Sequence, residues 1–193
     1  VRVAIDGGGG AGKTMLANEL VSPIRRMGRS VIRASIDGFH NPRSVRYQRG
    51  RGSSEGYFRD SFNVEELAST LLIPLGPEGS LRYRPAIFDY RTDSEMAAPV
   101  ELAAADAIVL FDGVLLHQTA LQPHWDFSIF VHTQIEISFS RMAQRDGSSP
   151  HVDAEENRRY VEGERLYHAE CAPKALADVV VDNSDLENPV CIG

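Results

Sequence analysis

The chain has 193 residues, 42% of them hydrophobic, a length that suits one well-buried domain and is marginal for two. Its formal net charge is −7 at pH 7, so the surface as a whole does not attract DNA, RNA or an acidic membrane, and an anionic ligand requires a local binding site. The two cysteines, Cys171 and Cys191, are too few for a disulfide framework, which favours a reducing compartment.

No apolar run approaches the roughly 18 residues that cross a bilayer, and the chain does not open with a signal-peptide pattern. We therefore expect a cytoplasmic protein with neither a nucleic-acid nor a membrane partner. Because Val1 already lies in a strand-like run, we also expect a few native residues to precede it.

The first predicted elements are a strand, a helix and a second strand. Residues 1–5 form a short β-branched run that ends at Asp6 and a cluster of glycines. Residues 13–27 place apolar side chains at nearly helical spacing, and Gly28 ends that helix. The next apolar run, residues 31–36, predicts the second strand.

The middle of the chain predicts one helix and two further strands. Asn63 and Glu66 have the spacing of a capping box, which predicts a helix that runs from there to Ile73. Residues 107–111 are apolar throughout, as in a central parallel strand that is buried on both faces. Residues 127–131 form the next strand-like run.

The last predicted elements are a helix at residues 135–145 and a strand at residues 177–181. Strands that alternate with helices are typical of parallel strands joined by crossover helices. We therefore predict an α/β fold of three layers, with a doubly wound, mostly parallel sheet between helices. Two polar stretches, residues 40–60 and 146–158, are longer than ordinary connections and are candidates for function or disorder.

The sharpest motif, GGGGAGKT at residues 7–14, is a full G-x-x-x-x-G-K-[ST] match between a predicted strand and a predicted helix. Glycines let backbone N–H groups and the helix N-terminus point at phosphates, Lys13 would reach the β- and γ-phosphates, and Thr14 would ligate Mg²⁺. A glycine-rich turn without a ligand is the alternative, and the register of strand, Lys13, Thr14 and helix argues against it. The predicted ATP-binding residues are Gly7, Gly8, Gly9, Gly10, Ala11, Gly12, Lys13, Thr14 and Met15.

Two aspartates follow predicted strands, at the edge where α/β sheets place ligand sites. Asp112 follows residues 107–111 and would hold Mg²⁺ together with Thr14; the alternative is an ordinary Asp-Gly turn. Asp37 ends the strand at residues 31–36 and is the best candidate for the group that orients an acceptor hydroxyl and takes its proton. For Asp37 the alternative is a turn residue that only accepts backbone N–H bonds.

The polar stretch at residues 40–60 is rich in arginine. Four guanidinium groups could bind a phosphorylated or carboxylated substrate through bidentate hydrogen bonds. A mobile, solvated loop is the other interpretation, because Gly50, Gly52 and two serines loosen the same stretch. The four arginines are Arg43, Arg46, Arg49 and Arg51.

Over most of its length the chain resembles the phosphoribulokinase and uridine kinase family of P-loop kinases. Residues 37–40, DGFH, are similar to the Asp-x-Phe segment whose aspartate is the family's catalytic base. Residues 57–63, YFRDSFN, look like the segment whose aspartate, here Asp60, holds the ribose hydroxyls of the acceptor. Residues 110–114, LFDGV, resemble the family's Walker B strand, in which glutamate is usual where this chain has Asp112.

The resemblance continues towards the C-terminus. Residues 139–146 look like the lid helix whose arginines embrace the phosphates, which gives Arg141 and Arg145 that role, and residues 165–183 resemble the closing helix and strand. The resemblance implies a P-loop NTPase fold with a helical lid. It divides one kinase domain, residues 1–193, into an acceptor-side segment at 40–62, a lid at 139–160 and the remaining body.

The segment that corresponds to the family's pyrimidine-binding residues departs from the pattern. Uridine-cytidine kinases carry Tyr-Asp-Phe followed by a histidine, and this chain has FDYRTD at residues 88–93. Phe88 could still stack on a base, but Asp93 cannot donate a hydrogen bond as a histidine can. The resemblance implies a substrate site made of Asp37, His40, Asp60, Phe88 and Tyr90.

Together these features predict transfer of the γ-phosphoryl group of ATP, with Mg²⁺, to a hydroxyl of a small metabolite, most favourably a nucleoside. The predicted catalytic residues are Asp37, Lys13, Arg141 and Arg145. One alternative is a kinase for another acceptor, such as pantothenate, a sugar phosphate or another ribosyl compound. A second is an ATPase or nucleotide switch without an organic acceptor. The oligomeric state, including a homodimer, stays open.

Overall fold

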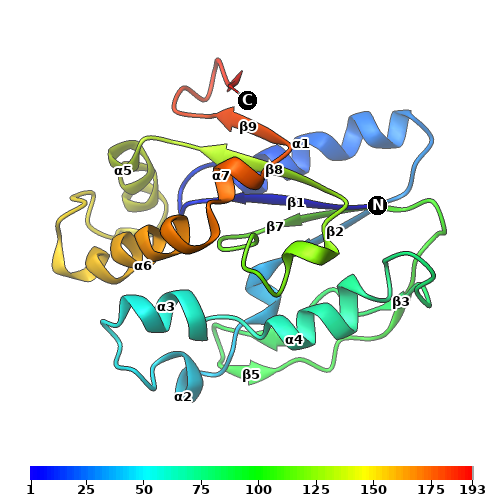
Figure 1. The fold of residues 1–193 in the computed structure, drawn as a ribbon, viewed down its shortest axis with the longest axis horizontal. Helices are drawn as coiled ribbons and strands as arrows, with labels where there is room; N and C mark the ends of the chain where they lie inside the picture. Colours follow the sequence, from blue (N-terminus) through cyan, green and yellow to red (C-terminus); the bar gives the residue numbers. More distant parts are fainter. Residues whose placement is uncertain (193) are drawn as a thin grey trace.

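The computed structural model describes residues 1–192, and its centre is a six-stranded sheet (Figure 1). The strand order is β10-β9-β8-β1-β7-β2; neighbours from β9 to β2 are parallel, and β10 is antiparallel to β9. The strands are β1 (Arg2–Gly7), β2 (Val31–Ser35), β7 (Ile108–Asp112), β8 (Phe127–His132), β9 (Val179–Asp182) and β10 (Val190–Cys191).

All five strands predicted from the apolar runs are present, with ends shifted by one or two residues. The prediction omitted β10 and two small two-stranded sheets, in which β3 (Arg82–Tyr83) pairs with β6 (Glu101–Leu102) and β4 (Phe88–Asp89) pairs with β5 (Ser94–Glu95). Strands of two residues are too short to show an alternating pattern, so the sequence contains no signal for them.

Helices cover both faces of the sheet, which confirms the three-layer α/β prediction. Side chains alternate between the faces along each strand, so Val3 and Ile5 point to one face and Ala4 to the other. On the first face, α1 (Lys13–Arg26) packs on a small core made of Val3, Ile5, Ala11, Ala17, Leu110 and Val131. The larger core on the second face includes Phe39, Phe58, Leu67, Leu71, Phe111, Leu116 and Tyr167.

The capped helix predicted from Asn63 is present but changes its winding. The Asn63 side chain accepts a hydrogen bond from the Glu66 amide at 3.1 Å, α4 spans Val64–Leu67, and a π-helical turn, η2, continues over Ala68–Leu72. The arginine-rich stretch is folded rather than a solvated loop: it contains α2 (Arg43–Arg46) and α3 (Ser54–Asp60).

The helices α5 (Ile135–Asp146), α6 (Glu155–Cys171) and α7 (Pro173–Leu176) follow β8. Gly147, with φ at 77°, ends α5, so the second polar stretch divides into a connection at residues 147–154 and the first turn of α6. The helices α3, α5 and α6 gather near the C-terminal edge of the parallel strands (Figure 1). Within residues 1–192, no helix is both long and apolar enough to span a membrane.

Candidate active site

A cavity of about 660 Å³ opens where β1, β2 and β7 end. Its walls come from the glycine-rich loop, the turn η1 (Ile36–Phe39) after β2, the end of β7, and the helices α3, α5 and α6. The carboxyl ends of parallel strands meet at one edge of a sheet, so the strand-ending residues converge there. Of the predicted site residues, those that line this cavity are Gly9, Gly10, Lys13, Thr14, Asp37, His40, Asp112 and Arg145.

The loop between β1 and α1 has a backbone that only glycine allows. Gly7, Gly10 and Gly12 have φ angles of 148°, 71° and 96°, in the left-handed region that other residues rarely adopt. A Cβ atom at Gly7 would lie 2.3 Å from the carbonyl oxygen of Val131, and one at Gly10 would lie 2.4 Å from that of Ser138. The absence of side chains at these positions lets the loop pack closely against β8 and α5 and exposes its backbone to a bound anion.

Lys13 begins α1 beneath this loop, and its ammonium group donates a hydrogen bond to the carbonyl oxygen of Gly8 at 2.6 Å. Burial lowers the pKa of Lys13, and the carboxylates of Asp6, Glu164 and Asp112 oppose that shift. A buried cation that lines the cavity beside a helix N-terminus fits the phosphates of ATP.

Thr14 and Asp112 meet at the floor of the cavity, although 98 residues separate them: the Thr14 hydroxyl donates to Asp112 Oδ2 at 2.5 Å. The other carboxylate oxygen of Asp112 accepts from the Arg33 guanidinium at 2.7 Å, and the aspartate is 3% exposed. Two hard oxygen ligands at one point fit Mg²⁺, which keeps most of its remaining positions for water and phosphate oxygens. Arg33 was not predicted as a site residue. The sequence feature that could have indicated it is a charged side chain within the otherwise mostly apolar strand β2.

Asp37 lies in the turn η1, exposed at the cavity wall. Its backbone N–H donates to Ser35 Oγ at 3.4 Å, and its carbonyl lies 3.1 Å from His40 Nδ1. Among the described residues its carboxylate has no hydrogen bond or ion pair, unlike a turn aspartate that accepts backbone N–H groups. Burial lowers the pKa of His40, although the Asp37 carbonyl and carboxylate oppose the shift, so the imidazole at this wall is neutral near pH 7.

Three of the predicted substrate residues do not line the cavity. The carboxylate of Asp60 accepts a hydrogen bond from Arg49 at 2.8 Å. Phe88 is 5% exposed in the β4–β5 hairpin, and the Tyr90 ring lies 4.9 Å from the ring of His40. Their predicted contact with an acceptor stays a prediction.

The two predicted lid arginines make different contacts, although both lie on α5. Arg145 lines the cavity and pairs with Asp146 at 2.9 Å. Arg141 instead donates to the carbonyl oxygens of Asn183 and Ser184 at 3.0 and 2.9 Å, which joins α5 to the segment after β9. Of the pair, only Arg145 is already placed at the cavity.

Several cavity residues were not predicted. Tyr57 of α3, Tyr160 of α6 and Phe62 form an aromatic wall, and the rings of Tyr57 and Tyr160 meet edge to face at 5.1 Å. Burial raises the pKa of Tyr57 well above its ordinary value, so the phenol keeps its proton. A second set, Met142, Gly147, Ser148, Glu156 and Asn157, comes from α5, α6 and the connection between them.

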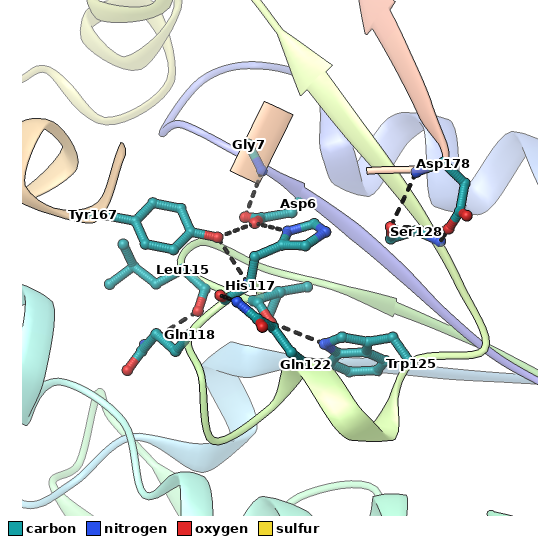
Figure 2. A network of polar contacts seen from close by, with 11 residues as sticks. Asp6, Gly7, Leu115, His117, Gln118, Gln122, Trp125, Ser128, Tyr167 and Asp178 are labelled. Atoms are coloured by element: carbon teal, nitrogen blue, oxygen red, sulfur yellow. Dashed lines mark hydrogen bonds and ion pairs between the residues drawn. The ribbon is translucent and has the colours of Figure 1, made fainter. Parts of the chain in front are cut away.

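A buried polar network underlies the loop (Figure 2). The Asp6 carboxylate accepts from the Gly7 amide at 2.7 Å and from the Tyr167 hydroxyl, and it lies 2.6 Å from His117 Nδ1. Tyr167 also accepts a hydrogen bond from the His117 amide at 2.7 Å. Asp6, directly before the glycine-rich loop, thus joins the loop to α6 and to the segment after β7. No local sequence pattern indicates this role.

Comparison with known proteins agrees with this geometry. The chain matches the model of the phosphoribulokinase / uridine kinase family over residues 2–157. It is 33% identical over 147 residues to a uridine kinase of Leuconostoc citreum (strain KM20), covering 75% of this chain and 67% of that one. A uridine kinase of Ligilactobacillus salivarius (strain UCC118) is 27% identical over 198 residues, covering 100% and 89%.

Solved structures share the fold. A possible uridine kinase from Bacillus stearothermophilus superposes with a TM-score of 0.73 at 27% identity and covers 93% of this chain and 87% of that one. The phosphoribulokinase from Rhodobacter spheroides gives a TM-score of 0.60 at 15% identity, with coverage of 94% and 69%, a likeness of fold alone. The family match spans most of the chain, so the protein belongs to the phosphoribulokinase and uridine kinase family of ATP-dependent P-loop kinases.

Proposed function

We propose that this kinase transfers the γ-phosphoryl group of ATP, with Mg²⁺, to a hydroxyl of a nucleoside, and that uridine is the first acceptor to test. One observation carries the proposal. The unpartnered carboxylate of Asp37 lies in the same cavity as Lys13, Thr14 and Asp112. Phosphoryl transfer to a hydroxyl requires a proton acceptor close to the groups that bind the phosphates and the metal ion, and these residues share one cavity.

Each group at the cavity has a proposed task. Lys13 and the loop amides hold the phosphates, and Thr14 and Asp112 hold Mg²⁺, which when bound neutralises charge on the phosphate oxygens. Asp37 takes the proton of the acceptor hydroxyl as the hydroxyl oxygen bonds to the γ-phosphorus, and the bond from the γ-phosphorus to the bridging oxygen breaks to release ADP. Arg145 stabilises the charge that develops in transfer.

The proposed lid, residues 139–160, contributes Met142, Arg145 and Tyr160 to the cavity. A lid that closes over both substrates excludes water and so limits hydrolysis of ATP. In the acceptor-side segment, residues 40–62, His40 and the aromatic wall of Tyr57 and Phe62 offer surfaces on which a planar base can stack. This wall is the observation that favours a nucleoside over a compact sugar phosphate.

The test measures ADP formation from ATP and Mg²⁺ with uridine, cytidine, other nucleosides, pantothenate or phosphorylated sugars. We expect uridine or cytidine to stimulate it. Asp37→Asn should lower that rate by about 10²–10⁴-fold, because general base catalysis is lost, while the affinity for ATP stays nearly unchanged. The matched control is Asp106→Asn, an exposed aspartate before β7 and outside the cavity.

The outcomes separate the acceptor from the chemistry. Stimulation only by pantothenate or a phosphorylated sugar would leave the transfer chemistry intact and refute the nucleoside. Steady phosphate release that no acceptor changes would instead favour an ATPase and contradict the proposal. A fully active Asp37→Asn variant would remove Asp37 from the mechanism.

A further inference from the structure

Glu164 of α6 lies directly against the phosphate-binding loop. Its Oε1 accepts a hydrogen bond from the Gly9 amide at 3.1 Å. Its carboxylate oxygens also lie 2.9 and 3.2 Å from the point where a Cβ atom at Gly8 would stand. A half-buried carboxylate thus covers two consecutive residues of the loop that must receive the phosphates of ATP.

The hydrogen bond from the Gly9 amide to Glu164 resembles the bond that a loop amide makes to a phosphate oxygen. Loop amides and the P-loop lysine are the groups that hold phosphate oxygens, and here an anionic oxygen occupies one such amide. Burial raises the pKa of Glu164, while the Gly9 amide and the Lys13 ammonium act in the opposite direction. The Glu164 carboxyl group therefore lies between the loop and α6, in contact with an amide that a nucleotide phosphate also uses.

The helix that carries Glu164 is anchored on both sides of it. A Cβ atom at Gly163 would stand 2.4 Å from the Tyr57 ring, so α6 and α3 touch at that point. Three residues after Glu164, on the same face of the helix, Tyr167 donates to Asp6 below the loop (Figure 2). These contacts of Gly163 and Tyr167 fix the position of α6, so we do not expect the Glu164 side chain to be needed for holding this helix in place.

We propose that the Glu164 carboxylate occupies the place of a nucleotide phosphate oxygen at the Gly9 amide, and that ATP must displace this carboxylate to bind. The inference rests on the nucleotide site of the proposed function but not on the identity of the acceptor. After transfer, the carboxylate competes with the phosphates of ADP for the Gly9 amide, which speeds the release of the nucleotide.

Two effects make the contact oppose nucleotide binding. ATP must break the bond between Glu164 and Gly9, and its phosphates then stand near a negative charge in a partly buried site. Removing the charge abolishes the repulsion and weakens the hydrogen bond to Gly9, and removing the side chain abolishes both. A residue that merely supported the loop would have the opposite signature, because its loss would weaken binding.

The experiment measures the Kd of a non-hydrolysable ATP analogue with Mg²⁺, and of ADP, by isothermal titration calorimetry without any acceptor. Glu164→Gln keeps the shape of the side chain and removes its charge, and Glu164→Ala removes the contact. We expect both variants to bind the two nucleotides about tenfold more tightly than the parent, mainly through slower dissociation. The matched control is Glu162→Gln, a half-exposed glutamate on the same helix that pairs with Arg158 and should leave Kd unchanged.

A second substitution guards against loss of the fold in Glu164→Ala. Glu164→Asp keeps the charge but is one methylene too short to reach the Gly9 amide, so it should bind more tightly than the parent and less tightly than Glu164→Gln. Unchanged or weaker binding in Glu164→Gln would overturn the inference, while the proposed kinase chemistry would stand. An equal gain in Glu162→Gln would overturn it as well, because the effect would then come from net charge alone.

Discussion

At the scale of single residues, the buried charged groups of this protein join segments that are distant in sequence. Asp6 joins β1 to α6, and Asp112 joins β7 to the start of α1. Arg2 is a third case: it is 5% exposed, and its guanidinium donates to Asp126 at 2.7 and 3.0 Å and to the carbonyl oxygen of Leu72 at 3.2 Å. A buried charge with one charged partner makes stability sensitive to that partner.

The Arg2–Asp126 pair predicts a stability that depends on pH. The Arg2 guanidinium holds the pKa of Asp126 below its usual value, so the pair stabilises the fold above about pH 4, and this contribution is lost as pH falls through the folded-state pKa. Asp126→Asn should lower the free energy of unfolding at pH 7 by about 2 kcal/mol, because it leaves Arg2 buried without a counter-charge. Urea unfolding at a series of pH values checks this.

The difference between parent and Asp126→Asn should shrink below about pH 4, because the parent then loses the same charge. Asp106→Asn, which removes a half-exposed aspartate, is the control and should change stability by less than about 0.5 kcal/mol. A deficit that persists unchanged at acid pH would show that packing, not charge, explains the effect.

At the scale of elements, the site depends on how α6 packs on α3. These helices carry Tyr160 and Tyr57 into the cavity, and they approach closely because Gly163 has no side chain. In an exposed helix, glycine costs about 1 kcal/mol relative to alanine. The glycine in α6 therefore marks a close approach of two helices.

Gly163→Ala tests this contact. A new Cβ atom would stand 2.4 Å from the Tyr57 ring and 2.9 Å from the carbonyl oxygen of Ser54. We expect a loss of about 1–3 kcal/mol in the free energy of unfolding, despite the better helix propensity of alanine, and a higher KM for the acceptor. Denaturant unfolding and steady-state kinetics measure the two effects. Glu162→Ala on the exposed side of α6 should be nearly neutral, and a stabilised Gly163→Ala would disprove the tight contact.

At the scale of the whole molecule, the cavity exists only when distant segments assemble. Its walls come from the loop after β1, the ends of β2 and β7, and the helices α3, α5 and α6. A ligand that touches all of these segments binds the folded state and not the unfolded chain. Nucleotide binding should therefore stabilise the entire domain by mass action.

A non-hydrolysable ATP analogue with Mg²⁺ at about 100 times its Kd should stabilise the fold by about 2.7 kcal/mol. For a chain of this length that corresponds to a rise of about 5–10 °C in the unfolding temperature, measurable by scanning calorimetry. Lys13→Ala should lose most of the rise because the phosphates lose their buried cation. A rise of the same size in Lys13→Ala would place the nucleotide elsewhere.

The sequence by itself determined the strands, the fold class and the phosphate loop, because each leaves a local signal. Apolar runs marked every parallel strand, and the glycines, Lys13 and Thr14 form one contiguous motif. The strand-ending positions of Asp37 and Asp112 also followed from local patterns, because parallel strands end at one edge.

The tertiary structure alone decided which other residues reach the cavity. Asp60, which the resemblance assigns to the acceptor site, pairs with Arg49 in this structure, while Tyr160 joins the cavity wall without any motif. Glu164 meets Gly9 across 155 residues of chain. No periodicity or spacing encodes contacts of this kind, because they depend on how α6 packs against the loop and α3, and that packing is set by side-chain shapes from many segments at once.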